Sequence, residues 1–335
     1  MNILLTGGTG YIGSHSAVSL ASAGHQIVLY DNLSNSDKSV LDRLEKITHQ
    51  KMVFTEGDVR DTALLSKVLS QNKIDAVMHF AGLKAVDESS KDPIKYYENN
   101  VAGSISLIKA MQLNNIKTLV FSSSATVYGE PQYLPYDEDH PKNPINTYGR
   151  TKLYVEEILH DLTSTNDEWS IAVLRYFNPL GAHASGLIGE KPQGIPNNLM
   201  PYLCQVASGK LEKLKIFGND YDTCDGTGER DYIHIMDLAE GHLAALEFLR
   251  LHRGWHAFNL GTGQSVSVLQ LIQAFEKINH IKIPYEIVNR RPGDLPVYFS
   301  KSDFAHKTLG WQAKYSIDAM CESSWYWELN SNNKS

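Results

Sequence analysis

Tyr148 and Lys152 are the two residues whose types and spacing most directly suggest chemistry. They lie four positions apart in a stretch with a helical pattern, so both side chains point to one face of a helix. Tyrosine, with an ordinary pKa of about 10, is a poor base at neutral pH, but an adjacent ammonium stabilises the phenolate and lowers that pKa. Such a pair arises about once by chance in a chain of this composition, so it indicates a catalytic site only together with other residues. The run Ser122–Ser124 supplies them, because it follows a strand pattern and offers a hydroxyl that could share a proton with Tyr148.

A glycine-rich turn directly follows the first strand pattern and opens a helical one. Gly7, Gly10 and Gly13 are spaced to give a tight turn and close approach of the backbone to a pyrophosphate, and the helix N-terminus adds N–H donors. Asp31 ends the second strand pattern, where a carboxylate accepts both hydroxyls of an adenosine ribose and repels a 2′-phosphate. Asn32 follows it, where an arginine would favour NADP. The pattern therefore predicts NAD as the cofactor.

Further candidates stand where the later strand patterns end. Open α/β sheets bind ligands at the carboxyl edge of their strands, so we expect these residues to face one crevice. They are Asp58 and Val59, then Phe80, Ala81 and Gly82, then Ser122 to Ser124, and finally Tyr176, Phe177 and Asn178.

These candidates need a parallel sheet to position them, and the sequence predicts one. Short apolar runs alternate with helical patterns, which is typical of βαβ units. We expect strands at 2–5, 26–30, 52–55, 76–80, 118–121 and 171–176, and helices at 11–23, 63–69, 93–113 and 148–162. The predicted fold is α/β, a Rossmann-type doubly wound parallel sheet with a smaller mixed α/β lobe. We assign 1–178 to an NAD-binding domain and 179–335 to an interleaved substrate lobe, with a segment near 235–260 returning to the first domain.

Composition excludes several function classes. The 335 residues carry a net charge of -7, which gives no electrostatic footprint for nucleic acid or an anionic membrane. No apolar run approaches the ~18 residues of a membrane span. The cysteines Cys204, Cys224 and Cys321 are odd in number and widely spaced, and the histidines show no paired ligand spacing. We therefore expect no metal site, no disulfide framework, and a cytoplasmic location.

The order of the motifs resembles the extended short-chain dehydrogenase/reductase superfamily: a glycine turn, Asp31, a serine run and a Tyr-x-x-x-Lys pair. Longer stretches across nearly the whole chain narrow the resemblance to the UDP-glucose 4-epimerase family. They are His79–Val86, Phe121–Gly129, Leu174–Pro179, Gly194–Pro201 and Gly226–His234. This resemblance implies reversible epimerisation of UDP-galactose and UDP-glucose at carbon 4, through a transient 4-ketosugar and tightly bound NAD.

The resemblance also implies roles for individual residues. Tyr148, aided by Ser124, would take the proton of the sugar 4-hydroxyl, while Lys152 would hold the nicotinamide ribose. The implied cofactor contacts are Gly7, Gly10, Tyr11, Ile12, Gly13, Asp31, Asn32, Leu33, Ser34, Asn35, Ser36, Asp58, Val59, Phe80, Ala81, Gly82, Lys84, Asn99, Ser122, Ser124, Tyr148, Lys152, Tyr176 and Phe177.

The implied substrate contacts lie mostly in the second lobe. Its arginines would bind the diphosphate, because planar guanidinium groups match phosphate oxygens. Besides Ser124 and Tyr148, the contacts are Asn178, Asn198, Leu199, Phe217, Arg230, Tyr232, Arg291, Asp294 and Tyr298. Tyr298 matches the position whose size gates the sugar pocket, which predicts exclusion of N-acetylated sugars. Lys215 departs from the family pattern and leaves one contact at the nucleotide edge open.

Other interpretations stay open at this point. The chain could epimerise UDP-N-acetylglucosamine instead. A nucleotide-sugar dehydratase is less favoured, because Ala125 and Thr126 follow Ser124 where dehydratases carry an acid and a base. A non-catalytic NAD sensor would not need Tyr148, Lys152 and Ser124 together. The family also pairs the helices expected at 93–113 and 148–162 across two copies, so we expect a homodimer.

Overall fold

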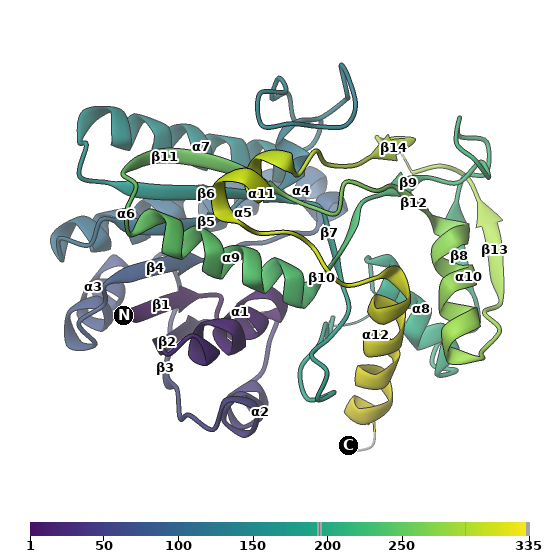
Figure 1. The fold of residues 1–335 in the computed structure, drawn as a ribbon, viewed down its shortest axis with the longest axis horizontal. Helices are drawn as coiled ribbons and strands as arrows, with labels where there is room; N and C mark the ends of the chain where they lie inside the picture. Colours follow the sequence, from purple (N-terminus) through teal and green to yellow (C-terminus); the bar gives the residue numbers. More distant parts are fainter. Residues whose placement is uncertain (193, 195, 292, 333–335) are drawn as a thin grey trace.

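The computed structural model describes residues 1–192, 194, 196–291 and 293–332 (Figure 1). Ile195, within one of the motif stretches, and Pro292, beside Arg291, lie outside the described residues.

A seven-stranded parallel sheet forms the larger part of the molecule, and the predicted Rossmann-type fold is confirmed. The strand order is β11-β6-β5-β4-β1-β2-β3. The strands are β1 (Asn2–Thr6), β2 (Gln26–Asp31), β3 (Val53–Glu56), β4 (Ala76–His79), β5 (Thr118–Ser122), β6 (Ser170–Tyr176) and β11 (Gly254–Leu260). The first six match the predicted runs to within one residue at each end. The order reverses between β1 and β4, which is where such sheets open a crevice.

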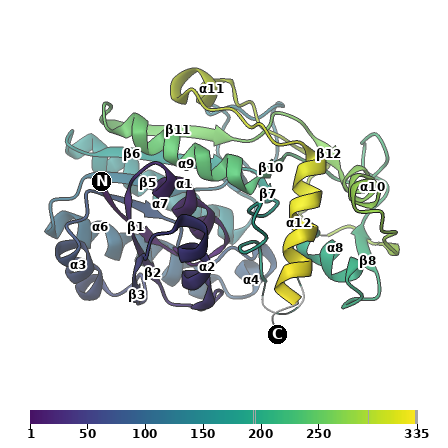
Figure 2. The same cartoon turned by 60° about the horizontal axis from the view of Figure 1, so that its bottom comes forward.

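Helices cover both faces of this sheet and bury two apolar clusters (Figures 1 and 2). On β1, Ile3 and Leu5 join the cluster beneath α1 and α9, whereas Leu4 joins the cluster beneath α3, α6 and α7. This alternation follows from the two-residue period of a strand. The helices are α1 (Tyr11–Ser22), α2 (Ser39–Thr48), α3 (Thr62–Gln71), α6 (Gly103–Leu113), α7 (Thr147–Thr165) and α9 (Ile235–Leu249).

The single helix expected at 93–113 is wrong in detail. The structure divides it into α5 (Pro93–Tyr96), a π-helical turn (Tyr97–Ala102) and α6, after the short helix α4 (Val86–Lys91). Asn100 explains the irregular turn, because its side chain accepts from Leu83 N at 2.8 Å and donates to Leu83 O at 3.0 Å and Thr151 Oγ1 at 3.1 Å. Tertiary hydrogen bonds thus override the local helical pattern, as π-turns near functional sites often show.

The residues after 178 form a second group of short elements beside the sheet (Figure 1). Its apolar core includes Leu203, Ile216, Leu271 and Phe275. The elements are β7 (Asn178–Leu180), α8 (Leu199–Ala207), β8 (Leu214–Phe217), β9 (Glu229–Arg230), β10 (Tyr232–His234), β12 (Val266–Ser267), α10 (Val268–Asn279), β13 (Tyr285–Val288), β14 (Val297–Tyr298) and α12 (Ile317–Asn332).

Some of the later chain belongs to the main sheet. Helix α9 packs along α1, and β11 pairs in parallel with β6, so the segment 235–260 lies against the first 178 residues. Helix α11 (Asp303–Leu309) also packs on β11 and α9. Within the described residues, none of the helices combines the length and the hydropathy that a transmembrane span needs.

Candidate active site

A cleft of about 780 Å³ opens at the carboxyl edge of β1, β2 and β4. Its walls come from the loops after these strands and from residues 188–192, 197 and 198 of the second lobe. Many of the predicted cofactor contacts line it: Gly7, Gly10, Tyr11, Ile12, Gly13, Asp31, Asn32, Ser34, Asn35, Ser36, Val59, Phe80, Ala81, Gly82, Lys84 and Asn99. The predicted substrate contact Asn198 lines it as well.

The glycine turn leaves no room for side chains. Gly7 has a φ of +68°, and a Cβ there would lie 2.7 Å from Ala81 N. A Cβ on Gly13 would overlap the carbonyl oxygen of Gly7. Helix α1 then begins at Tyr11 with Gly10 as its N-cap, and no side-chain cap or acidic residue occupies its first turn in the described chain. Its free N–H groups and its dipole therefore suit a pyrophosphate.

The carboxylate of Asp31 is held at the end of β2 by three donors. Oδ2 accepts from Thr9 N at 3.1 Å, and Oδ1 accepts from Leu33 N at 2.9 Å and Ser36 Oγ at 3.3 Å. These bonds hold the carboxylate in the wall of the cleft. Leu33 thus contributes a backbone N–H to Asp31 and is absent from the cleft lining given by the described residues.

Asp58 lies behind the cleft lining and binds a neighbour. Its carboxylate accepts from Arg60 Nε at 2.8 Å and Nη2 at 2.9 Å, and from Asn32 Nδ2 at 3.3 Å. The hydrogen bonds from Arg60 are the largest cause that lowers the pKa of Asp58 to about 2. Its backbone carbonyl accepts from the Tyr30 hydroxyl at 2.7 Å, which fixes the loop after β3.

Tyr148, Lys152 and Ser124 come together where β5 ends and α7 begins. Asn146 caps α7 by accepting from Gly149 N at 2.8 Å, which fixes the first turn that carries Tyr148. Lys152 Nζ donates to Ser122 O at 2.7 Å and lies 3.6 Å from where a Cβ on Gly82 would stand. Since Gly82 lines the cleft, the ammonium lies just behind its wall.

Burial dominates the electrostatics of this group. It raises the pKa of Tyr148 to about 12, with a smaller lowering by the hydrogen bond with Ser124. It lowers the pKa of Lys152 to about 8, with a smaller raising by Glu156. Lys152 is not among the causes that shift the pKa of Tyr148 in the chain alone, so its predicted lowering of that pKa stays a prediction for the filled site. The reason is geometric, because Nζ lies 5.8 Å from the centroid of the Tyr148 ring and bonds to Ser122.

Thr126 is a site residue that the sequence argument treated only as an inert neighbour. Its Oγ1 donates to Ser124 Oγ at 3.0 Å and its backbone N donates at 3.2 Å. Both bonds orient the Ser124 hydroxyl, whose residue is only 8% exposed. The two oxygen lone pairs are thus used, and the Ser124 proton is free to point toward Tyr148.

A cluster of aromatic rings lies close to Tyr148. Tyr298 packs against Tyr136 and Phe177, with ring centroids 5.0 and 5.1 Å apart. Burial raises the pKa of Tyr298, and Tyr148 is among the smaller causes, so the two phenols are neighbours. Tyr176 is partly buried, and its pKa is raised by desolvation of the hydroxyl and by Tyr148.

The predicted diphosphate contacts each have a partner within the chain. Arg230 forms an ion pair with Asp294 and donates to Leu295 O at 2.8 Å. The guanidinium of Arg291 stacks over Phe217 at 3.9 Å from the ring centroid.

The remaining predicted substrate contacts differ in exposure. Asn178 begins β7 and is exposed, whereas Tyr232 on β10 is only 5% exposed and belongs to the core of the second lobe. Leu199 begins α8, and no side-chain cap or acidic residue occupies the first turn of that helix in the described chain. Lys215 is exposed on β8 and lies opposite Glu286 of β13.

Sequence reasoning missed Glu190 and Trp327, which also line the cleft. Glu190 Oε1 accepts from Lys84 Nζ at 2.8 Å and from Asn198 Nδ2 at 2.7 Å, and Trp327 Nε1 donates to Glu190 O at 3.1 Å. A charged residue inside a stretch rich in glycine and proline is the signal that could have found Glu190. Trp327 stands in α12 with no motif around it.

A model of the NAD dependent epimerase/dehydratase family matches residues 3–261. The chain belongs to this family. A UDP-glucose 4-epimerase of Bacillus subtilis (strain 168) is 53% identical over 333 residues, which are 99% of this chain and 98% of the relative. One of Neisseria meningitidis serogroup C is 52% identical over 332 residues, again 99% and 98%.

Solved structures of the NAD dependent epimerase/dehydratase type superpose on the whole chain. UDP-glucose-4-epimerase from Stenotrophomonas maltophila, with bound NAD and formylated UDP-arabinopyranose, gives a TM-score of 0.98 at 50% identity, covering 100% of both chains. The enzyme from Bifidobacterium longum, in complex with NAD+ and UDP, gives 0.97 at 47% identity, also covering 100% of both.

Membership of the NAD dependent epimerase/dehydratase family requires a place for the dinucleotide, and the described residues fit one. The glycine turn offers a cradle that any Cβ would fill, α1 presents uncapped N–H groups, and Asp31 presents a carboxylate. Gly82 lies between this cleft and Lys152, so the ammonium is the cation nearest to this part of the wall that the sequence predicted as a cofactor contact. The residues present thus suit NAD.

Proposed function

We propose that this chain catalyses the reversible epimerisation of UDP-galactose and UDP-glucose at carbon 4 of the hexose, with NAD held tightly. One observation carries the proposal: Ser124, Tyr148 and Lys152 meet beside a dinucleotide cleft, in a chain that matches UDP-glucose 4-epimerases over nearly their whole length. The family also contains dehydratases. Ala125 has no titratable group and is buried beside Ser124, which favours epimerisation.

The cofactor contacts divide between backbone and side chain. Gly7, Gly10 and Gly13 with the start of α1 would hold the pyrophosphate, and Asp31 the adenosine ribose. Lys152 would hold the nicotinamide ribose. NAD, when bound, would supply the hydride acceptor for carbon 4 of the hexose and the hydride donor for the return step.

The proton chemistry belongs to Tyr148. Its Oη takes the proton of the sugar 4-hydroxyl and later gives one back, while Ser124 shares a hydrogen bond with both oxygens. In the chain alone the phenol stays protonated, because burial holds its pKa at about 12. The positive charge of a bound oxidised nicotinamide, together with Lys152, would lower this pKa in the filled site.

The substrate contacts would come from the second lobe. Arg230 and Arg291 bring two guanidinium groups for a diphosphate, and α8 aims an uncapped N-terminus at it. Tyr298 presents a full phenol ring, buried between Tyr136 and Phe177. A ring of this size leaves no space for an N-acetyl group, which favours UDP-glucose and UDP-galactose over UDP-N-acetylglucosamine.

We propose further that the enzyme is a cytoplasmic homodimer. The exposed side chains of Ile94 on α5 and Tyr154 on α7 lie on the elements that the family pairs, and Tyr97 stacks on Tyr154 at 6.0 Å between ring centroids. All three cysteines are free, as in proteins of a reducing compartment. Light scattering tests the assembly, and a monomer at all concentrations would contradict it.

A coupled assay tests the activity. Purified protein is given UDP-galactose without added NAD, and UDP-glucose formation is followed alongside Tyr148→Phe. We expect conversion by the wild type and a loss of at least ~10²-fold in kcat for the variant, because the phenylalanine cannot move a proton. No conversion by the wild type, even with NAD supplied, would reject the proposal.

A further inference from the structure

Three successive turns of α7 engage three successive serines at the end of β5. Tyr148, Lys152 and Glu156 are spaced by four residues, so their side chains form one buried row. Tyr148 interacts with the Ser124 hydroxyl, Lys152 Nζ donates to Ser122 O at 2.7 Å, and Ser123 Oγ donates to Glu156 Oε1 at 2.5 Å. The first two residues of this row were predicted to do chemistry, and the third was not.

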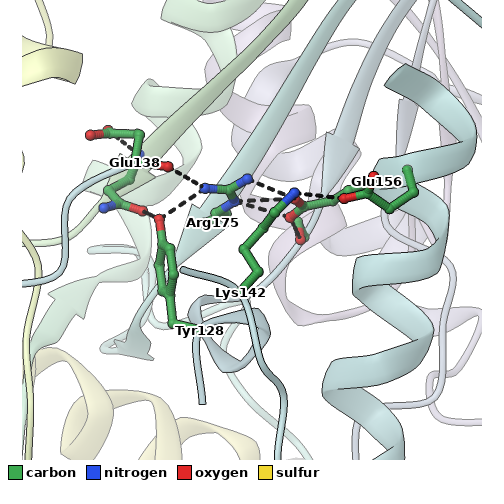
Figure 3. Close-up of polar contacts among 8 residues, drawn as sticks. Tyr128, Glu138, Lys142, Glu156 and Arg175 are labelled. Atoms are coloured by element: carbon green, nitrogen blue, oxygen red, sulfur yellow. Dashed lines mark hydrogen bonds and ion pairs between the residues drawn. The ribbon is translucent and has the colours of Figure 1, made fainter. Parts of the chain in front are cut away.

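The carboxylate of Glu156 is fully buried and firmly held. Arg175 of β6 donates to it from Nε at 3.1 Å and from Nη2 at 2.7 Å (Figure 3). Both side chains are at most 1% exposed. Lys142 Nζ lies 3.8 Å from Glu156 Oε2 and is a second cation beside this carboxylate.

Arg175 is itself locked by further bonds. Its Nη1 donates to the Tyr128 hydroxyl at 3.1 Å and to Glu138 O at 3.1 Å (Figure 3). The Tyr128 hydroxyl donates in turn to Asn259 Oδ1 at 2.7 Å. The network therefore ties Glu156 to β6 and β11, so the carboxylate cannot move away from the serines.

We propose that Glu156 is a positioning residue of the active site: through Ser123 it fixes the serine run that carries Ser124, and its carboxylate is the buried counter-charge of the Lys152 ammonium. The groups facing Lys152 agree with this. Tyr148 and His79 are neutral, and Ser122 offers only a carbonyl oxygen, which leaves Glu156 as the carboxylate one helical turn away. Glu156 also raises the pKa of Lys152 against the effect of burial.

The test replaces the charge and keeps the shape. Glu156→Gln retains an oxygen that accepts from Ser123 but removes the negative charge. Loss of an opposite charge one helical turn away lowers the pKa of an ammonium by ~1 unit, so Lys152 should lose its proton at correspondingly lower pH. We expect the alkaline limb of kcat to move down by about one pH unit from its wild-type position, with KM little changed.

Two control variants separate charge from position. Ser123→Ala keeps the carboxylate, and we expect it to lower kcat at every pH without moving the alkaline limb. Glu157→Gln removes the neighbouring, exposed carboxylate that binds Lys142 at 2.7 Å, and we expect it to leave the profile unchanged.

A second readout does not depend on turnover. The inference rests on the proposed function, so the pKa of Lys152 is also measured directly, from the pH dependence of its acetylation by acetic anhydride, followed by peptide mass spectrometry. A wild type without epimerase activity would reject the proposed function, while this titration would still decide the role of Glu156.

Folding is controlled by a double variant. Removing one partner of a buried pair is far more disruptive than replacing both, so Glu156→Gln with Arg175→Met preserves the fold if the single variant does not. We expect a smaller shift of the Lys152 titration in the same direction in the double variant, because losing the Arg175 positive charge partly offsets losing the carboxylate. An unshifted titration in either folded variant, with activity reduced equally at all pH values, would assign Glu156 a structural role alone and overturn the inference.

Discussion

The dinucleotide cleft and the predicted substrate contacts are built in different ways. Around the glycine turn the backbone itself makes the site, and Gly7 and Gly13 leave no room for a side chain. In the second lobe the predicted contacts are side chains, and they are already paired: Arg230 with Asp294, and Arg291 with Phe217.

The difference has consequences for binding. A site made of backbone N–H groups is preorganised, so little order is lost when a ligand arrives. A site made of paired side chains must exchange its internal partners for the ligand, which weakens binding and permits release. A tightly kept cofactor and an exchanging substrate are what a reaction without net redox change requires.

Acid should damage the cofactor half most. In the first domain, burial lowers the pKa of His15 and His79 to about 3 and that of His242 to about 4. In the second lobe, burial lowers the pKa of His234 to about 4. Each is neutral when folded and binds a proton when unfolded. The free energy of unfolding therefore falls as the pH drops below ~6.5, by ~1.4 kcal/mol per pH unit for each such histidine, until its folded pKa is reached.

Denaturant unfolding of wild type and His79→Gln between pH 7 and 5 checks this. The variant should show a slope that is smaller by ~1.4 kcal/mol per pH unit. His252→Gln is the control. His252 is exposed and lies just beyond the C-terminal end of α9, and the variant should keep the wild-type slope. Equal slopes for His79→Gln and wild type would show that His79 does not resist protonation.

Gly13→Ala tests the backbone-built cleft. The new Cβ would overlap Gly7 O and lie 2.8 Å from Gly8 Cα, and backbone atoms cannot turn aside. We expect a loss of ~2–3 kcal/mol in the free energy of unfolding and loss of co-purified NAD. Gly10→Ala, whose Cβ would lie 3.2 Å from Gly7 O, should cost clearly less. The NAD content of each variant is measured after gel filtration. Equal NAD content in Gly13→Ala and Gly10→Ala would contradict the idea that steric crowding limits this turn.

The same contrast explains what the sequence could predict. Glycines before a helix and an aspartate after a strand act through local backbone geometry, so Gly7, Gly13 and Asp31 were found from spacing alone. Asn100 bends a helix through Leu83 and Thr151, and Glu156 meets Arg175 across a helix and a strand. Such contacts depend on the folded arrangement, and no local pattern marks them.

The pKa of Tyr148 in the chain alone could not be predicted from spacing, for a related reason. Its spacing to Lys152 is right, but the direction of its pKa depends on burial and on what the ammonium binds. Local spacing places a side chain on a face, whereas packing decides its solvation. Helix α2 (Ser39–Thr48) was not predicted either, although Val40, Leu44 and Ile47 recur at helical spacing in its sequence.

Arg230→Lys tests the side-chain-built half. Lysine has no planar guanidinium group, so it cannot bind Leu295 O and Asp294 together and still reach a diphosphate. We expect KM for UDP-galactose to rise ~10-fold, with kcat and NAD content nearly unchanged. Arg290→Lys is the matched control, because Arg290 stacks on Tyr221 and binds Asp220 outside the predicted site. Loss of NAD from Arg230→Lys would mean that the two halves are not independent.

Glu190 is where the two halves touch, so its replacement gives the smallest and most informative effect. One carboxylate oxygen accepts from Lys84, a predicted cofactor contact, and from Asn198, a predicted substrate contact. Glu190→Gln loses a partly exposed ion pair worth ~0.2–1 kcal/mol, so NAD dissociation and KM should each change by about two- to fivefold. Glu276→Gln is the control, since that carboxylate binds Lys282 Nζ at 2.7 Å and Ile283 N at 2.9 Å far from the cleft. If only one of the two constants changes, Glu190 serves one half, and the cofactor and the substrate bind without coupling through this loop.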